Sequence, residues 1–189
     1  MSATTRHELI VGGTGGQGVI TIGYALAEAA ATVHRHVTRF PTYMATMRGG
    51  PAFCTVIFSD DEIPAAILSR TMNAIAMEGG SFSRLKKEVR PGGRLFVNSS
   101  IVKKPEPLPG YAVFEIPVTD LAQEIGAAGM ANLIMLGAYR EITGVLSDEL
   151  IRTSLAKTLA AEGKDGKLDR MMAAYEKGVA FARALAKSA

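Results

Sequence analysis

The stretch that decides the fold is Glu-Leu-Ile-Val-Gly-Gly-Thr-Gly-Gly-Gln-Gly-Val, residues 8–19. Residues 8–12 are short and apolar, as expected of a buried strand, and the glycines over 12–18 form a turn. From Val19 to about Val33 the chain is apolar and rich in alanine, which predicts a helix. A strand, a glycine-rich turn and a helix make up the βα unit of an α/β sheet. The sequence therefore predicts an α/β fold.

The rest of the chain supplies further elements of the same kind. Strands are expected over 36–40, 52–59, 72–77, 94–98 and 111–116, with a short helix over 81–89 and loops over 41–51 and 103–110. We expect Pro41 to stop the second strand and Pro91 to open a turn, since proline lacks an N–H donor. Helices are expected over 119–125 and 131–143, after a Ser147 cap, and from Gly166 onward. With no repeat or linker visible, we expect one domain over 1–189, with C-terminal helices from about 147.

Composition excludes several function classes. The net charge is only +3, the basic residues are scattered and tryptophan is absent, a pattern that does not favour nucleic-acid binding. No apolar run approaches the roughly 20 residues needed to cross a bilayer, and residues 1–13 hold no apolar stretch of signal-peptide length behind a basic end. We therefore expect a cytoplasmic protein without nucleic-acid or membrane partners.

The turn Gly13–Gly18 fits the pattern G-x-G-x-x-G between a strand and a helix. Glycines allow positive φ and close backbone approach, and a helix N-terminus presents free N–H groups to an anion. Dinucleotide binding also needs an acidic residue about 20 positions on, and residues 36–40 hold none, although Arg39 can meet a 2′-phosphate. A stand-alone NADP- or flavin-binding oxidoreductase therefore stays open, beside a turn that only packs the helix on the strand.

A second glycine site, Arg48-Gly49-Gly50, precedes the strand expected over 52–59. An arginine beside paired glycines suits recognition of an anion or close contact with the backbone of another chain.

Four segments together resemble one family. They are GGTGGQGV at 12–19, MRGGPAFCTVIFSDDEI at 47–63, VRPGGRLFVNSS at 89–100 and MANLIMLGA at 130–138. Over about residues 6–160, the chain resembles the γ subunit, or γ domain, of 2-oxoacid:ferredoxin oxidoreductases, and is most similar to the 2-oxoglutarate type. The resemblance implies a three-layer α/β/α sandwich with a mostly parallel sheet.

The resemblance also implies a role in a multisubunit enzyme. The family decarboxylates a 2-oxoacid, such as pyruvate or 2-oxoglutarate, oxidatively with coenzyme A (CoA). Its thiamine diphosphate, Mg²⁺ and [4Fe-4S] clusters are then expected on α, β and candidate ferredoxin-like δ subunits. One cysteine, Cys54, cannot hold a four-thiolate cluster, and no Gly-Asp-Gly motif is present. We expect no cofactor on this chain alone and no activity of the isolated chain.

Neither catalytic nor metal-ligating residues are expected. Candidates for contact with the 2-oxoacid, with CoA or with a neighbouring subunit are Gly13, Gly15, Gly16, Gln17, Gly18, Arg48, Gly49, Gly50 and Asn132. Gln17 can offer an amide hydrogen bond, and Arg48 can pair with a carboxylate or phosphate. Subunit packing is the leading interpretation for each. We expect the two glycine loops to be neighbours on a face that docks onto catalytic subunits.

Overall fold

The computed structural model describes residues 6–43, 49–103, 110–161 and 167–188. Its strands form one six-stranded sheet of order β2-β3-β1-β4-β5-β6. The strands are β1 His7–Thr14, β2 His36–Tyr43, β3 Pro51–Ser59, β4 Thr71–Ala76, β5 Val89–Asn98 and β6 Ala112–Ile116. Strands β1, β4, β5 and β6 run parallel, and β3 pairs antiparallel with both β1 and β2. The predicted mostly parallel sheet is confirmed.

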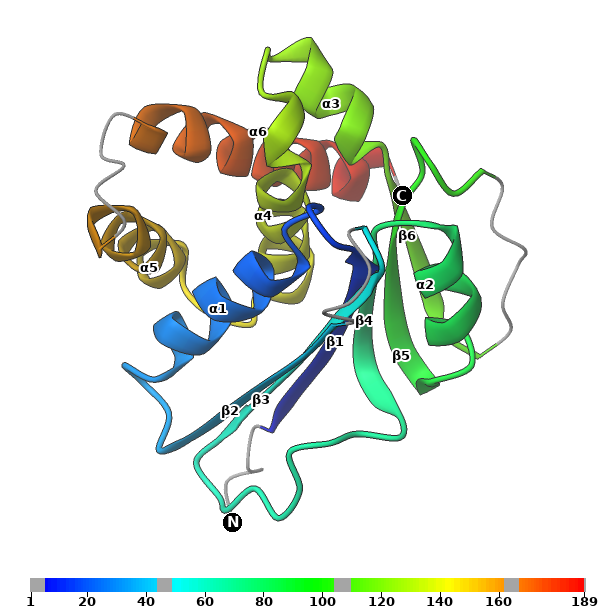
Figure 1. Ribbon diagram of the computed structural model, residues 1–189, viewed down its shortest axis with the longest axis vertical. Helices are drawn as coiled ribbons and strands as arrows, with labels where there is room; N and C mark the ends of the chain where they lie inside the picture. Colours follow the sequence, from blue (N-terminus) through cyan, green and yellow to red (C-terminus); the bar gives the residue numbers. More distant parts are fainter. Residues whose placement is uncertain (1–5, 44–48, 104–109, 162–166, 189) are drawn as a thin grey trace.

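Helices cover both faces of this sheet. They are α1 Val19–Ala30, α2 Gly79–Leu85, α3 Val118–Glu124, α4 Ala131–Thr143, α5 Asp148–Ala161 and α6 Leu168–Ser188, with a 3₁₀ turn at Ala128–Met130. Figure 1 shows α2 on one side of the sheet and α1, α4, α5 and α6 on the other. This is the predicted three-layer α/β/α arrangement.

The side chains of β1 point alternately to the two faces of the sheet and so contribute to two hydrophobic cores. Leu9 and Val11 face the larger core, which α1, α4, α5 and α6 complete, whereas Ile10 faces the smaller core beneath α2. Because successive side chains of a strand point to opposite faces, one apolar strand can serve both layers.

Two glycines bring α4 and α6 into close contact. A Cβ atom on Gly178 would lie 1.9 Å from the carbonyl oxygen of Ile134, and one on Gly137 would lie 2.1 Å from that of Tyr175. No side chain fits at either position. Residues 132–139 of α4 are buried without exception, which agrees with the apolar sequence of this segment.

Two expectations about the first strands are wrong. Strand β2 continues through Pro41 to Tyr43, because β2 lies at the edge of the sheet, where a proline need not sacrifice a ladder hydrogen bond. Gly13 and Thr14 belong to β1 rather than to the turn, and Gly12 lies within the strand, as expected of residues 8–12. A Cβ on Gly12 would lie 2.6 Å from the ring of Phe53, so close neighbours require glycine within the strand.

The expected helix over 81–89 and the turn after it are also corrected. Helix α2 ends at Leu85, and β5 begins at Val89 and includes Pro91 and Gly93. The β4–β5 register shifts between Thr71 and Asn73, and a Cβ on Gly93 would lie 2.6 Å from the carbonyl oxygen of Met72. The glycine admits this irregularity in the sheet.

The expected cap of α5 is present, since the Leu150 N–H donates to Ser147 Oγ at 3.3 Å. In the part of the chain that the structure describes, the helices are too short or too polar to span a bilayer.

Candidate functional site

The first glycine loop follows the end of β1, the second precedes the start of β3, and the two loops are in contact there. The Gly15 N–H donates to the carbonyl oxygen of Gly50 at 2.9 Å, just beyond the pairing of Thr14 with Pro51. The predicted proximity of the two loops is confirmed for Gly15, Gly49 and Gly50. Arg48 lies outside the described residues.

Gln17 holds the first turn together from within. Its Oε1 accepts the Thr14 N–H at 2.9 Å, and its own backbone N–H donates to the Thr14 carbonyl at 3.1 Å. A Cβ on Gly13 would lie 2.6 Å from the same Oε1. The side-chain oxygen is thereby used, which leaves the amide NH₂ of Gln17 as the group that can donate to a ligand.

Gly18 and Asn132 are neighbours although they are far apart in sequence. Gly18 has a φ of +70°, and a Cβ there would lie 2.3 Å from Asn132 Nδ2. That nitrogen also approaches the Gly18 carbonyl oxygen, at 3.5 Å. Asn132 is buried at the start of α4. Both of these candidates thus fix the start of α1 against the start of α4.

The N-terminus of α1 is left without a side-chain cap. Gly18 occupies the cap position, and the first turn contains no acidic residue. The first N–H groups of a helix have no partner within it, and the helix dipole adds partial positive charge there. This end of α1 therefore suits an anionic group.

A cleft of about 580 Å³ opens over this helix end. It is lined by Thr14, Gly15, Gly16, Gly18, Val19, Ile20, Thr21, Tyr43, Gly50 and Ala52. Gly16 and Gly49 have φ values of +94° and +78°, and a Cβ on either would meet no atom within 4 Å. Tyr43, 66% exposed, forms a wall that sequence reasoning missed, because Tyr43 was expected in a loop.

A second, smaller hollow of about 190 Å³ lies at the carboxyl ends of β4 and β5. Gly16, Gln17 and Asn132 line it together with Asn98 and Thr119. The Asn98 Nδ2 donates to the carbonyl oxygen of Met77 at 3.2 Å and to Thr119 Oγ1 at 3.0 Å. Sequence reasoning missed Asn98 and Thr119, although polar residues that follow strands of a parallel sheet signal such a crevice.

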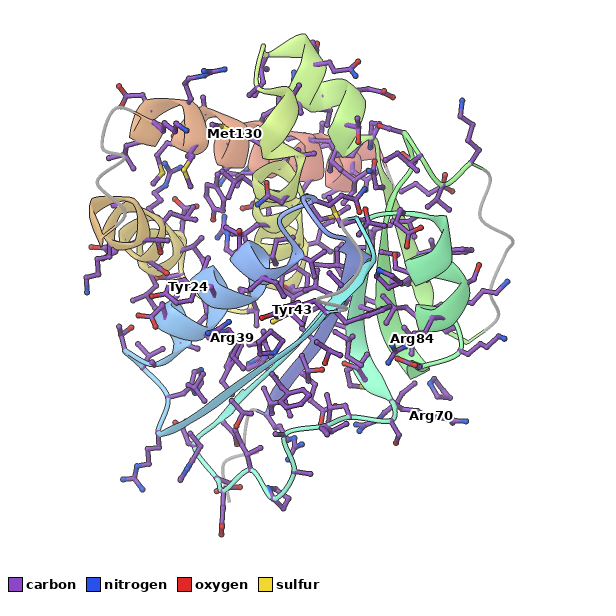
Figure 2. All side chains as sticks on the ribbon, viewed as in Figure 1. Tyr24, Arg39, Tyr43, Arg70, Arg84 and Met130 are labelled. Atoms are coloured by element: carbon purple, nitrogen blue, oxygen red, sulfur yellow. The ribbon has the colours of Figure 1, made fainter. Side chains whose placement is uncertain are left out.

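Arg39 lies along the strand that carries Tyr43. Its guanidinium stands 5.3 Å from the ring centre of Tyr24 on α1. Figure 2 shows Tyr24, Arg39 and Tyr43 along the same stretch between α1 and β2. The exposed cation is thus placed beside the cleft.

The described residues offer little to a metal or cluster. Among them, no group of three or more His, Cys, Asp or Glu side chains is placed to hold a metal ion. Cys54 is buried, and burial raises the pKa of its thiol to about 11, so it is neutral at ordinary pH. One neutral thiol does not fit an iron–sulfur cluster.

Comparison with known proteins adds a family to this geometry. Residues 8–181 match the family described as pyruvate ferredoxin/flavodoxin oxidoreductase. The chain is 30% identical to the ketoisovalerate oxidoreductase subunit VorA of Methanothermobacter thermautotrophicus over 177 residues, which cover 92% of this chain and 36% of VorA. It is 27% identical to the 2-oxoglutarate synthase subunit KorC of Methanocaldococcus jannaschii, over 95% of this chain and 96% of KorC.

A solved structure is similar as well. The 2-oxoglutarate:ferredoxin oxidoreductase of Magnetococcus marinus, with 2-oxoglutarate, CoA and succinyl-CoA bound, superposes with a TM-score of 0.85 at 25% identity. The match covers 95% of this chain and 31% of that one. The chain therefore spans about a third of the length of two of these relatives, VorA and the Magnetococcus protein.

Proposed function

Because the chain belongs to the pyruvate ferredoxin/flavodoxin oxidoreductase family, we propose that it is the γ subunit of a 2-oxoacid:ferredoxin oxidoreductase. The observation that carries the proposal is the family match over residues 8–181. The Gly15–Gly50 contact, which joins both glycine loops beside an uncapped helix, adds support. We assign 2-oxoglutarate as the substrate, in keeping with the similarity to KorC and to the Magnetococcus enzyme.

The proposal divides the chemistry among subunits. Thiamine diphosphate and Mg²⁺ supply the decarboxylation chemistry and [4Fe-4S] clusters the electron transfer, and all three belong to α, β and ferredoxin-like δ subunits. The single buried Cys54 does not fit a cluster. This chain contributes binding and positioning within a cytoplasmic complex.

Its own residues then serve CoA. The diphosphate of CoA is the natural occupant of the α1 N-terminus, because unpaired N–H groups and the helix dipole both favour an anion. Gly16 and Gly49 leave the approach open, and Gly18 packed on Asn132 fixes the position of the helix end. The Magnetococcus relative was solved with CoA bound, which supports CoA as a ligand of the complex.

Copurification tests the proposal. A tagged chain recovered from its own cells should bring down further subunits containing thiamine diphosphate and iron–sulfur clusters. The complex should reduce ferredoxin when 2-oxoglutarate and CoA are both supplied. Pyruvate and ketoisovalerate, supplied in place of 2-oxoglutarate, test the choice of oxoacid.

Two results would contradict the proposal. One is recovery of the chain alone from every preparation. The other is tight binding of NADP or a flavin by the isolated chain, lost in the Gly15→Val variant, which would favour a stand-alone oxidoreductase at the same turn.

A further inference from the structure

Among the residues that the structure describes, Arg39 is a charged side chain beside the cleft that the function described so far does not use. Among the described residues, no carboxylate forms an ion pair with it, and its guanidinium rests over the Tyr24 ring. An exposed arginine held by an aromatic face keeps its hydrogen-bond donors available while its position is restricted. Such an arginine is suited to bind an anion that arrives from solution.

The geometry connects Arg39 to the cleft from two sides. On β2, Arg39 and Tyr43 are four residues apart and therefore point to the same face of the sheet, and Tyr43 lines the cleft. On α1, Tyr24 lies one turn after Ile20, which also lines the cleft. The Arg39–Tyr24 pair therefore lies just beyond the cleft, on the side of α1 and β2 that also carries Ile20 and Tyr43.

The spacing fits a ligand with two anionic groups. Tyr24 is six residues from Gly18, which places it roughly 9 Å along the helix from its N-terminus. CoA carries its diphosphate and a separate monophosphate on the same ribose, so a diphosphate at the helix N-terminus leaves the second phosphate free to lie toward Arg39. Arginine recognises phosphate through parallel N–H···O bonds.

We propose that Arg39 binds the ribose 3′-phosphate of CoA and so determines the preference for CoA over dephospho-CoA. The inference rests on the proposed function, because it takes the diphosphate to lie at the N-terminus of α1. NADP offers the same chemistry through its 2′-phosphate, so the experiment includes it.

The test uses the copurified complex with wild-type chain and with Arg39→Gln. We expect kcat/KM for CoA to exceed that for dephospho-CoA by about tenfold in the wild type, in line with one charge-assisted contact. In Arg39→Gln this ratio should fall to near one, through KM and with kcat unchanged. Arg39→Lys keeps the charge and should retain a good part of the preference. Arg35→Gln removes an exposed positive charge just before β2 and should leave the ratio as in the wild type.

The outcomes separate the two proposals. A wild-type ratio preserved in Arg39→Gln, or equal loss of activity with both cofactors, overturns the role of Arg39 while the proposed function stands. A preference of the chain for NADP over NAD that disappears in Arg39→Gln, without an effect on CoA, assigns the same chemistry to another ligand and overturns the inference. A complex that never uses CoA overturns the proposed function together with it.

Discussion

Glycine is used for opposite reasons in two regions of this molecule. Between α4 and α6, Gly137 and Gly178 are closed positions, where a Cβ would overlap the backbone of the facing helix. At the cleft, Gly16 and Gly49 are open positions, where a Cβ would meet nothing within 4 Å but the backbone adopts a positive φ. The first pair exists for packing and the second for backbone conformation and access.

The number of glycines in a chain therefore says little about its flexibility or function. Helix propensity alone would favour alanine at Gly178 by up to about 1 kcal/mol, yet the contact forbids it. At Gly16 the space would accept alanine, yet the conformation disfavours it. Each class makes its own prediction for the same substitution.

The largest effect is expected for Gly178→Ala. Its methyl group would push α6 away from Ile134, and overpacking of this kind costs about 3 kcal/mol, more than the helix propensity returns. Urea denaturation followed by circular dichroism should show the loss. Gly79→Ala is the matched control, because a Cβ there meets nothing within 4 Å and its φ is ordinary. Equal midpoints for the two variants would contradict the close contact.

A second closed glycine allows a rescue experiment. A Cβ on Gly23 would lie 2.3 Å from the Sγ of Cys54, so Gly23→Ala should cost about 2 kcal/mol. Cys54→Ala removes that sulfur, and the double variant should be more stable than the two single losses predict, with a coupling of about 1 kcal/mol. Simple additivity in the same denaturation series would mean that the sulfur is not the obstacle.

The open class is tested at Gly16. Gly16→Ala should cost only about 1 kcal/mol of stability, the strain of a positive φ. Its main effect should be a higher KM for CoA in the complex, because strain is relieved by moving the turn away from the helix end. A loss of stability as large as that of Gly178→Ala, with KM unchanged, would place Gly16 in the closed class.

The smallest effect is expected for Asp148→Asn, which tests whether an ion pair also stabilises the region around α4 and α6. Burial favours the neutral form of Asp148, but hydrogen bonds from Arg152 and Tyr175 outweigh this and lower its pKa. A lowered carboxyl pKa contributes stability that is present at neutral pH and is lost as the pH falls below about 4. Asp148→Asn should therefore lower Tm at pH 7. The corresponding loss in free energy of unfolding should be less than about 1 kcal/mol, because this group is partly exposed. The difference in Tm between the wild type and the variant should shrink toward pH 3. A difference that does not depend on pH would argue against the ion pair.

Local sequence predicted the element types well and their ends less well. The apolar run of β1 and the alanine-rich α1 have strong patterns, and both are present. Pro41 misled because the edge position of β2 depends on strand order, which no local pattern encodes. Gly93 was expected in a turn, but a glycine is required there because the carbonyl oxygen of Met72, on a different strand, lies too close for a Cβ.

The candidate site shows the same division. The two glycine loops were expected to be neighbours, and the contact between Gly15 and Gly50 is present; the pairing of β1 with β3 that brings them together was not predicted. The role of Gln17 as a clasp of its own turn could not be predicted, because which oxygen meets which N–H depends on turn geometry. Tyr43 was not predicted to line the site, because the second strand was expected to end at Phe40 and not at Tyr43.

The state of Cys54 has a practical consequence for these experiments. Because the chain has a single, buried thiol whose pKa burial raises to about 11, the native protein presents no reactive sulfur at pH 8. A cysteine introduced at Tyr43 can then be labelled selectively in the wild-type background. The rate at which the Cys54 thiol reacts with a labelling reagent then measures how often the protein opens, since the thiol is reached only when the sheet and α1 separate.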